Sequence, residues 1–166
     1  MMKTFKGILS FLLLMALFTG NTNIVIAQKK VSAKETEIKN LLYSQQYIFY
    51  AQSAIPSSGR QRFLTSEYTV TISKDTIVCY LPYFGRAYSA MLGTTDGGIK
   101  FTSVDFDYTI SDRKKGGWEI NIHPKGGQDV QKLNFTVYNN GTAYLFVNSN
   151  NRQSISFNGY VRARKK

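Results

Sequence analysis

The sequence predicts a mainly β domain that follows a single helix. From Tyr47 onward, β-branched and aromatic residues alternate with polar ones in short runs, and Gly, Asn, Asp and Pro interrupt the runs as turns do. We expect about eight strands in an antiparallel meander. Strands with one apolar face can bury it by closing into a barrel or by folding into a two-layer sandwich, and the sequence leaves both open.

The helix is expected at about residues 33–45. Ser32 and Glu35 have the spacing of a capping box, and Val31 stands at the hydrophobic-staple position. Four residues fall on one helical face: Ile38, Leu41, Leu42 and Gln45. We expect this face to pack over an open end of the β structure.

Apolar alternation also predicts the register of several hairpins. A two-residue turn at Lys74–Asp75 collects one apolar face in three pairs: Tyr68–Leu81, Val70–Cys79 and Ile72–Ile77. Further along, a second apolar face is expected from two neighbouring runs. The first contains Val104, Phe106, Tyr108 and Ile110, and the second contains Trp118, Ile120 and Ile122.

The hairpin around Asn140 allows two loops. A two-residue Asn140–Gly141 turn would divide the apolar residues between both faces of the sheet. A three-residue loop over 139–141, with Gly141 left-handed, instead places six on one face: Leu133–Val147, Phe135–Leu145 and Val137–Ala143. We favour the three-residue loop.

The N-terminus has the pattern of an export signal. Lys3 and Lys6 precede an apolar run that is too short to cross a bilayer, and Ala27 is a small residue at the expected cleavage point. We therefore expect a signal peptide over residues 1–27 and one mature domain over 28–166, without a transmembrane segment. The localisation would be periplasmic or secreted.

The net charge of the mature chain indicates which classes of partner it could bind. Without the two signal lysines, the 21 basic residues become 19 against 10 acidic ones, a formal charge of +9. The basic excess lies mainly at ends and turns, which is typical of solvated surfaces. Nucleic acid is a poor partner for an exported chain, so we expect an anionic envelope glycan, a lipid headgroup or another envelope protein.

Few residues indicate catalysis. Cys79, the only cysteine, lies on a predicted core face, and His123 is the only histidine, with no carboxylate at ligand spacing. We assign no catalytic residue, metal or cofactor. Asp105 and Asp107 share a strand face and could serve a hydrolase acting on envelope or dietary glycans, although a solvated strand face is the reading we favour.

The stretch "CYLPYFGRAYSA", residues 79–90, combines four aromatic residues with the only cysteine, a proline and an arginine. Pro82 ends a strand and Gly85 permits a turn, so the chain leaves the sheet there. Four residues on this connection are candidate ligand-binding residues: Tyr83, Phe84, Arg86 and Tyr88. The alternative is that their rings plug the barrel end.

"YLPYFGRAY" at residues 80–88, together with "GGIKF" and "GTAYLFVNSNNRQSISFNG", resembles the domain of unknown function 4251 family of exported proteins in Bacteroidota-type bacteria. The resemblance runs from about Lys34 to Val161 and implies a small exported β-rich protein. It supplies no activity, substrate or catalytic residue for this chain. In such a host, Asp75-Thr76-Ile77 looks like an O-glycosylation acceptor at Thr76. We therefore expect a non-enzymatic binding or scaffolding protein of the cell envelope, with the hydrolase as the alternative.

Overall fold

The computed structural model describes residues 32–88, 97–127 and 129–164. The expected signal peptide, with its cleavage after Ala27, lies outside the described residues. Within them, one helix precedes nine strands: α2 (Ala33–Ser44), β1 (Tyr47–Pro56), β2 (Arg62–Ile72), β3 (Ile77–Leu81), β4 (Ile99–Ser103), β5 (Phe106–Asp112), β6 (Trp118–Pro124), β7 (Val130–Val137), β8 (Thr142–Ser149) and β9 (Ile155–Ala163).

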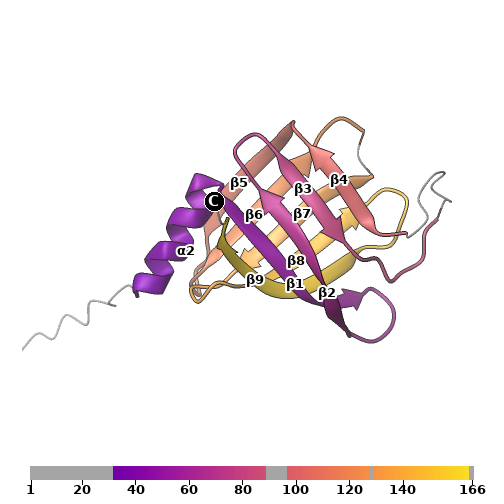
Figure 1. Ribbon diagram of the computed structural model, residues 1–166, viewed down its shortest axis with the longest axis horizontal. Helices are drawn as coiled ribbons and strands as arrows, with labels where there is room; N and C mark the ends of the chain where they lie inside the picture. Colours follow the sequence, from indigo (N-terminus) through magenta and orange to yellow (C-terminus); the bar gives the residue numbers. More distant parts are fainter. Residues whose placement is uncertain (1–31, 89–96, 128, 165–166) are drawn as a thin grey trace, which may run out of the picture. The chain divides into compact units, whose positions relative to one another are not determined.

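All the strands belong to one antiparallel sheet in the order β4-β3-β2-β1-β9-β8-β7-β6-β5, which curls into a nearly closed barrel (Figure 1). The two edge strands, β4 and β5, are consecutive in the chain, with only Val104 and Asp105 between them. β4 pairs with β3 and β5 pairs with β6, so one bent segment bridges the two edges of the sheet.

That bent segment explains two differences from the expected pattern. The structure has nine strands where the sequence predicted about eight, because the bend divides one apolar run into β4 and β5. Val104, expected on the apolar face, is 76% exposed because it lies in the bend, outside both strands. Of the two expected architectures, the structure is the barrel.

The expected hairpin registers are confirmed with one exception. Ile72 pairs with Ile77 and Val70 with Cys79, but the ladder ends at Thr69 and Tyr80, one residue short of the expected Tyr68–Leu81 pair. In the later hairpin the favoured three-residue loop is present, with Gly141 at φ +87°. Its ladder contains the three expected pairs: Leu133–Val147, Phe135–Leu145 and Val137–Ala143.

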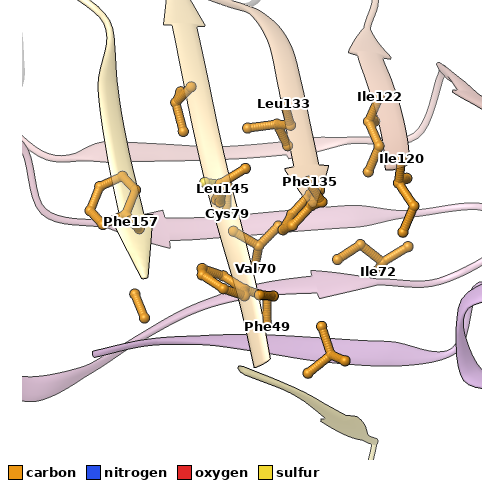
Figure 2. Close-up of a cluster of buried hydrophobic side chains, with 14 of the residues drawn as sticks. Phe49, Val70, Ile72, Cys79, Ile120, Ile122, Leu133, Phe135, Leu145 and Phe157 are labelled. Carbon is orange, nitrogen blue, oxygen red and sulfur yellow. The ribbon is translucent and has the colours of Figure 1, made fainter. Parts of the chain in front are cut away.

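The interior of the barrel is filled by apolar side chains. In Figure 2 the labelled residues of β1, β2 and β3 point toward those of β6, β7, β8 and β9. Phe49 and Phe135 meet edge to face with ring centres 5.5 Å apart. Cys79 is 2% exposed within this core, as its strand register predicted. Burial of this kind supplies most of the free energy of folding.

α2 packs on one end of the barrel, as expected. The Ser32 hydroxyl accepts a hydrogen bond from the Glu35 backbone N–H at 3.0 Å, which caps the helix. Ile38 and Leu42 are fully buried. The hydroxyl of Tyr108 on β5 donates to the Leu42 carbonyl oxygen at 2.9 Å, so the last turn of the helix is bonded to the barrel.

Candidate functional site

The segment from Pro82 to Tyr88 leaves β3 and lies against the loop that joins β8 to β9. The Gln153 backbone N–H donates to the Arg86 carbonyl oxygen at 3.0 Å, and the Tyr88 N–H donates to the Asn151 carbonyl oxygen at 2.7 Å. These backbone bonds fix the course of the segment independently of its side chains.

Arg152, from the β8–β9 loop, is buried beneath this segment. Its side chain is 6% exposed, and Nε lies 2.9 Å from Oδ2 of Asp129, which is 12% exposed. Nη1 donates to the carbonyl oxygens of Gly97 and Gly98 at 2.9 and 3.3 Å. The guanidinium carbon is 5.0 Å from the ring centre of Tyr83. One buried cation thus joins three connections at this part of the barrel.

Two of the four predicted binding residues are used inside the protein. The Tyr83 hydroxyl lies 2.8 Å from the Arg86 carbonyl oxygen and 3.0 Å from that of Gln153. Burial raises the pKa of the Tyr83 phenol. Phe84 is half-buried against the core, and the Arg62 guanidinium lies 4.9 Å from its ring centre. These two rings fit the alternative of a plug at the barrel end.

The other two predicted residues face solvent. Arg86 is exposed, and Tyr88 is 70% exposed. The structure therefore brings the four candidates together on one segment but divides them into an inner pair and an outer pair. Recognition of a ligand by this segment stays a prediction.

The candidate catalytic carboxylates form a surface ion-pair cluster. Lys125 Nζ lies 2.7 Å from Oδ1 of Asp107 and 3.7 Å from Oδ1 of Asp105. The hydrogen bond that Lys125 donates to Asp107 raises the pKa of the Lys125 ammonium. The Asp105 and Asp107 side chains are 72% and 61% exposed, so both are solvated. They do not share a strand face as expected, because Asp105 lies in the bend before β5. His123, exposed, pairs with Asp107 across β5 and β6.

Other expectations concern metal binding, membrane spanning and modification. Within residues 32–88, 97–127 and 129–164, no three His, Cys, Asp or Glu side chains are grouped as a metal site would need. No helix of this described part has the length and apolarity to span a membrane.

Thr76, the candidate glycosylation site, lies half-buried beside the β2–β3 turn, and its carbonyl oxygen accepts a hydrogen bond from the Ser73 N–H at 2.8 Å. Its glycosylation stays a prediction.

Sequence reasoning missed a groove on the outer face of β9, β1 and β2, called the outer groove below. One hollow of about 320 Å³ is lined by Tyr50, Tyr160 and Arg162 on one side and by Tyr68 and Glu67 on the other. It continues through Ala51 and Gln52 into a second hollow of about 520 Å³, whose lining includes Ser53, Gln61, Phe63 and Asn158. The signal was present only in part, at the outward positions of Tyr50 and Tyr160. Tyr68 was expected on the apolar face opposite Leu81, but in the structure it lines the hollow and stacks on the exposed Tyr80.

Two stacks flank the first hollow, and each consists of one cation and two tyrosine rings: Arg162–Tyr160–Tyr50 and Lys100–Tyr80–Tyr68. The tyrosine ring centres are 5.3 Å apart in the first stack and 5.5 Å apart in the second. Each cation lies 4.7 Å from the centre of the nearer ring. Such contacts stabilise the rings in a fixed orientation.

Comparison with known proteins gives the family. The family model described as "Domain of unknown function (DUF4251)" matches residues 29–161. The chain is similar to the crystal structure of a DUF4251 family protein from Bacteroides eggerthii DSM 20697, with a TM-score of 0.57 and 18% identity, over 78% of this chain and 87% of that one. At this identity the likeness shows the fold alone, and no curated protein matches. Because the family model spans most of the sequence and the resemblance is thereby confirmed, the chain belongs to the DUF4251 family.

Proposed function

We propose that this protein is an exported, non-enzymatic binding or scaffolding protein of the cell envelope, and that Arg86 and Tyr88 contact its partner. The observation that carries the proposal is the division of the aromatic segment. Tyr83 and Arg152 hold the segment from beneath, while Arg86 and Tyr88 point their side chains to solvent. A segment fixed before binding loses little conformational entropy when a partner arrives.

The chemistry of the partner follows from the exposed pair. A guanidinium forms bidentate hydrogen bonds to carboxylate or phosphate, and a tyrosine ring adds contact area at a low entropic cost. The mature chain is also strongly basic, with a formal charge of +9 after removal of Lys3 and Lys6. These features favour an anionic envelope glycan, a lipid headgroup or an acidic surface of another envelope protein.

A pull-down of envelope components with the mature protein tests this function. We expect retention of a component by the native protein and a clear loss with the double variant Arg86→Ala, Tyr88→Ala. The matched control is Lys39→Ala, Tyr43→Ala, which removes another exposed cation and ring, 5.6 Å apart on α2. Equal retention by all three proteins would contradict a role for the exposed pair.

Export is a separate part of the proposal. Lys3, Lys6 and the following apolar run support it, as does Ala27 at the expected cleavage point. Mass spectrometry of the protein from its host should find an N-terminus at or within a few residues of Gln28. A mature protein that retains Met1 would contradict export by a cleaved signal.

A further inference from the structure

The outer groove exists because strand pairing is irregular beneath it. The register of β1 shifts between Ala51 and Ser53 against both neighbouring strands. Against β9 the shift leaves Gln52 as an extra residue, whereas against β2 the excess residues are those of β2. On β2 the partners change from Tyr68 to Phe63 across the same shift. A β-bulge turns side chains away from their regular positions, and bulges are frequent beside binding sites.

Gly159 on β9 lets two strands approach closely on the core side of the groove. It pairs with Ala51, and a Cβ built at Gly159 would lie 1.9 Å from the carbonyl oxygen of Tyr50 and 2.9 Å from Cε2 of the buried Phe49. Any larger residue would push β9 and β1 apart. The strands beneath the groove are therefore closely packed, while its walls are the long side chains on either side.

Aromatic faces and hydrogen-bonding groups alternate along the groove. Tyr50 and Tyr68 line the first hollow, and Phe63, which is 83% exposed, lines the second. Between and beside the rings lie the amides of Gln52, Gln61 and Asn158. Sugar rings have C–H faces that pack on aromatic rings and hydroxyls that need amide partners, so this lining suits a glycan better than an acyl chain.

The groove follows β1 and is basic on one wall. Its two hollows adjoin at Ala51 and Gln52, which suits a chain of sugars better than a single small molecule. On one wall Arg162 lies 4.7 Å from the ring centre of Tyr160, and the lining carboxylate, Glu67, stands on the other wall.

We propose that the outer groove binds a glycan chain that carries carboxylate groups. The sugar rings lie along Tyr50 and Tyr68, and the amide side chains of the groove take the hydroxyls. Arg162 takes the acidic groups. This surface is separate from Arg86 and Tyr88, so it can fail while the proposed function stands, and the reverse also holds.

The test is affinity electrophoresis of the mature protein in gels that contain polygalacturonate, with dextran as the neutral polymer of sugar. We expect strong retardation by polygalacturonate and weak retardation by dextran. Tyr50→Ala with Tyr160→Ala should weaken the binding constant for polygalacturonate by about tenfold or more. Tyr138→Ala, which removes an exposed ring under Arg113 outside the groove, should leave it unchanged.

Three variants separate binding from folding. Tyr50→Phe keeps the ring and should bind as the native protein does, and Arg162→Gln keeps most of the side chain's bulk and should weaken binding to the acidic polymer. Arg113→Gln should leave this binding unchanged, because that guanidinium lies over Tyr138, outside the groove. Circular dichroism spectra establish that each variant is folded.

Two results would overturn the proposal. Retardation that is the same in the native protein and in a folded Tyr50→Ala, Tyr160→Ala variant would show that net charge alone is responsible. Groove-dependent binding to phosphatidylglycerol vesicles, without binding to polygalacturonate, would make the occupant a lipid surface.

Discussion

The guanidinium of Arg152 lies 5.0 Å from the ring centre of Tyr83, and the same side chain is paired with Asp129 at 2.9 Å while only 6% exposed. A cation buried this deeply stabilises the fold only where a counter-charge and hydrogen-bond acceptors offset the loss of its water. Here carbonyl oxygens, a carboxylate and a ring face surround it, so it holds the end of the barrel on which Arg86 and Tyr88 are presented.

The first prediction separates these two arginines. Arg152→Ala should reduce the free energy of unfolding by roughly 3 to 5 kcal/mol, since it leaves the carboxylate of Asp129 buried without its cation. Arg86→Ala should change it by no more than about 0.5 kcal/mol, because the side chain is exposed. Urea denaturation of both variants measures the difference.

The expectations for Arg152→Ala and for Arg86→Ala can be contradicted separately. If Arg86→Ala unfolded the domain, Arg86 would be part of the barrel's internal support, and the proposed contact surface would have to be withdrawn. A stable Arg152→Ala variant would show instead that Asp129 finds another partner or water.

A second prediction concerns two neighbouring side chains of β3. Leu81 is fully buried, so Leu81→Ala should cost roughly 2 to 5 kcal/mol through lost apolar contact and the cavity left behind. Val78 points outward and is 43% exposed, so Val78→Ala should cost about 0.5 kcal/mol or less. Thermal midpoints of the two variants should differ clearly, and similar midpoints would show that the strand faces are wrongly assigned.

A third prediction concerns the only thiol. Cys79 is 2% exposed, and burial raises the pKa of its thiol. Since thiolate and access are both needed for alkylation, labelling of the native protein should be slow and should become fast in denaturing urea. Fast labelling without urea would mean that β3 opens readily or that its register is different.

A fourth prediction uses alkaline pH. Burial raises the pKa of Tyr108 to about 12, above the usual tyrosine value of 10.0. Folding therefore favours the protonated phenol. Its contribution to the free energy of unfolding is complete below pH 10, and that free energy falls by about 1.4 kcal/mol per pH unit as the pH rises from 10 toward 12. Burial also raises the pKa of Tyr47, whose hydroxyl lies 3.4 Å from that of Tyr108.

The comparison with Tyr108→Phe isolates this effect, since lysines lose their protons in both proteins. Urea midpoints measured between pH 8 and 11.5 should fall more steeply for the native protein than for the variant. Parallel curves would show that Tyr108 ionises in the folded state as easily as in the unfolded one.

Local patterns predicted most of the fold. The Ser32 cap, the Lys74–Asp75 turn and the left-handed Gly141 were predictable, because each depends on residues adjacent in sequence. Closure through Val104 and Asp105 was not, because the alternation of apolar residues carries no information about which edge strand a segment pairs with. The barrel therefore had to remain an alternative to the sandwich.

The candidate site was only half predictable, for a related reason. Tyr83 and Arg86 look alike as members of an aromatic, basic loop, and only long-range contacts with Arg152 and Gln153 separate the inner from the outer residue. Arg152 itself stands in an Asn-rich turn, where an arginine is normally exposed. Its burial depends on Asp129, 23 positions earlier in the chain.

The central claim is that the protein binds an envelope component without altering it. The most direct measurement is mass spectrometry of the component retained by the mature protein, before and after prolonged incubation. We expect retention with an unchanged mass, and a loss of retention in the Arg86→Ala, Tyr88→Ala variant. Fragments that appear with the native protein and are absent with Asp105→Asn, Asp107→Asn would contradict the claim and establish a hydrolase.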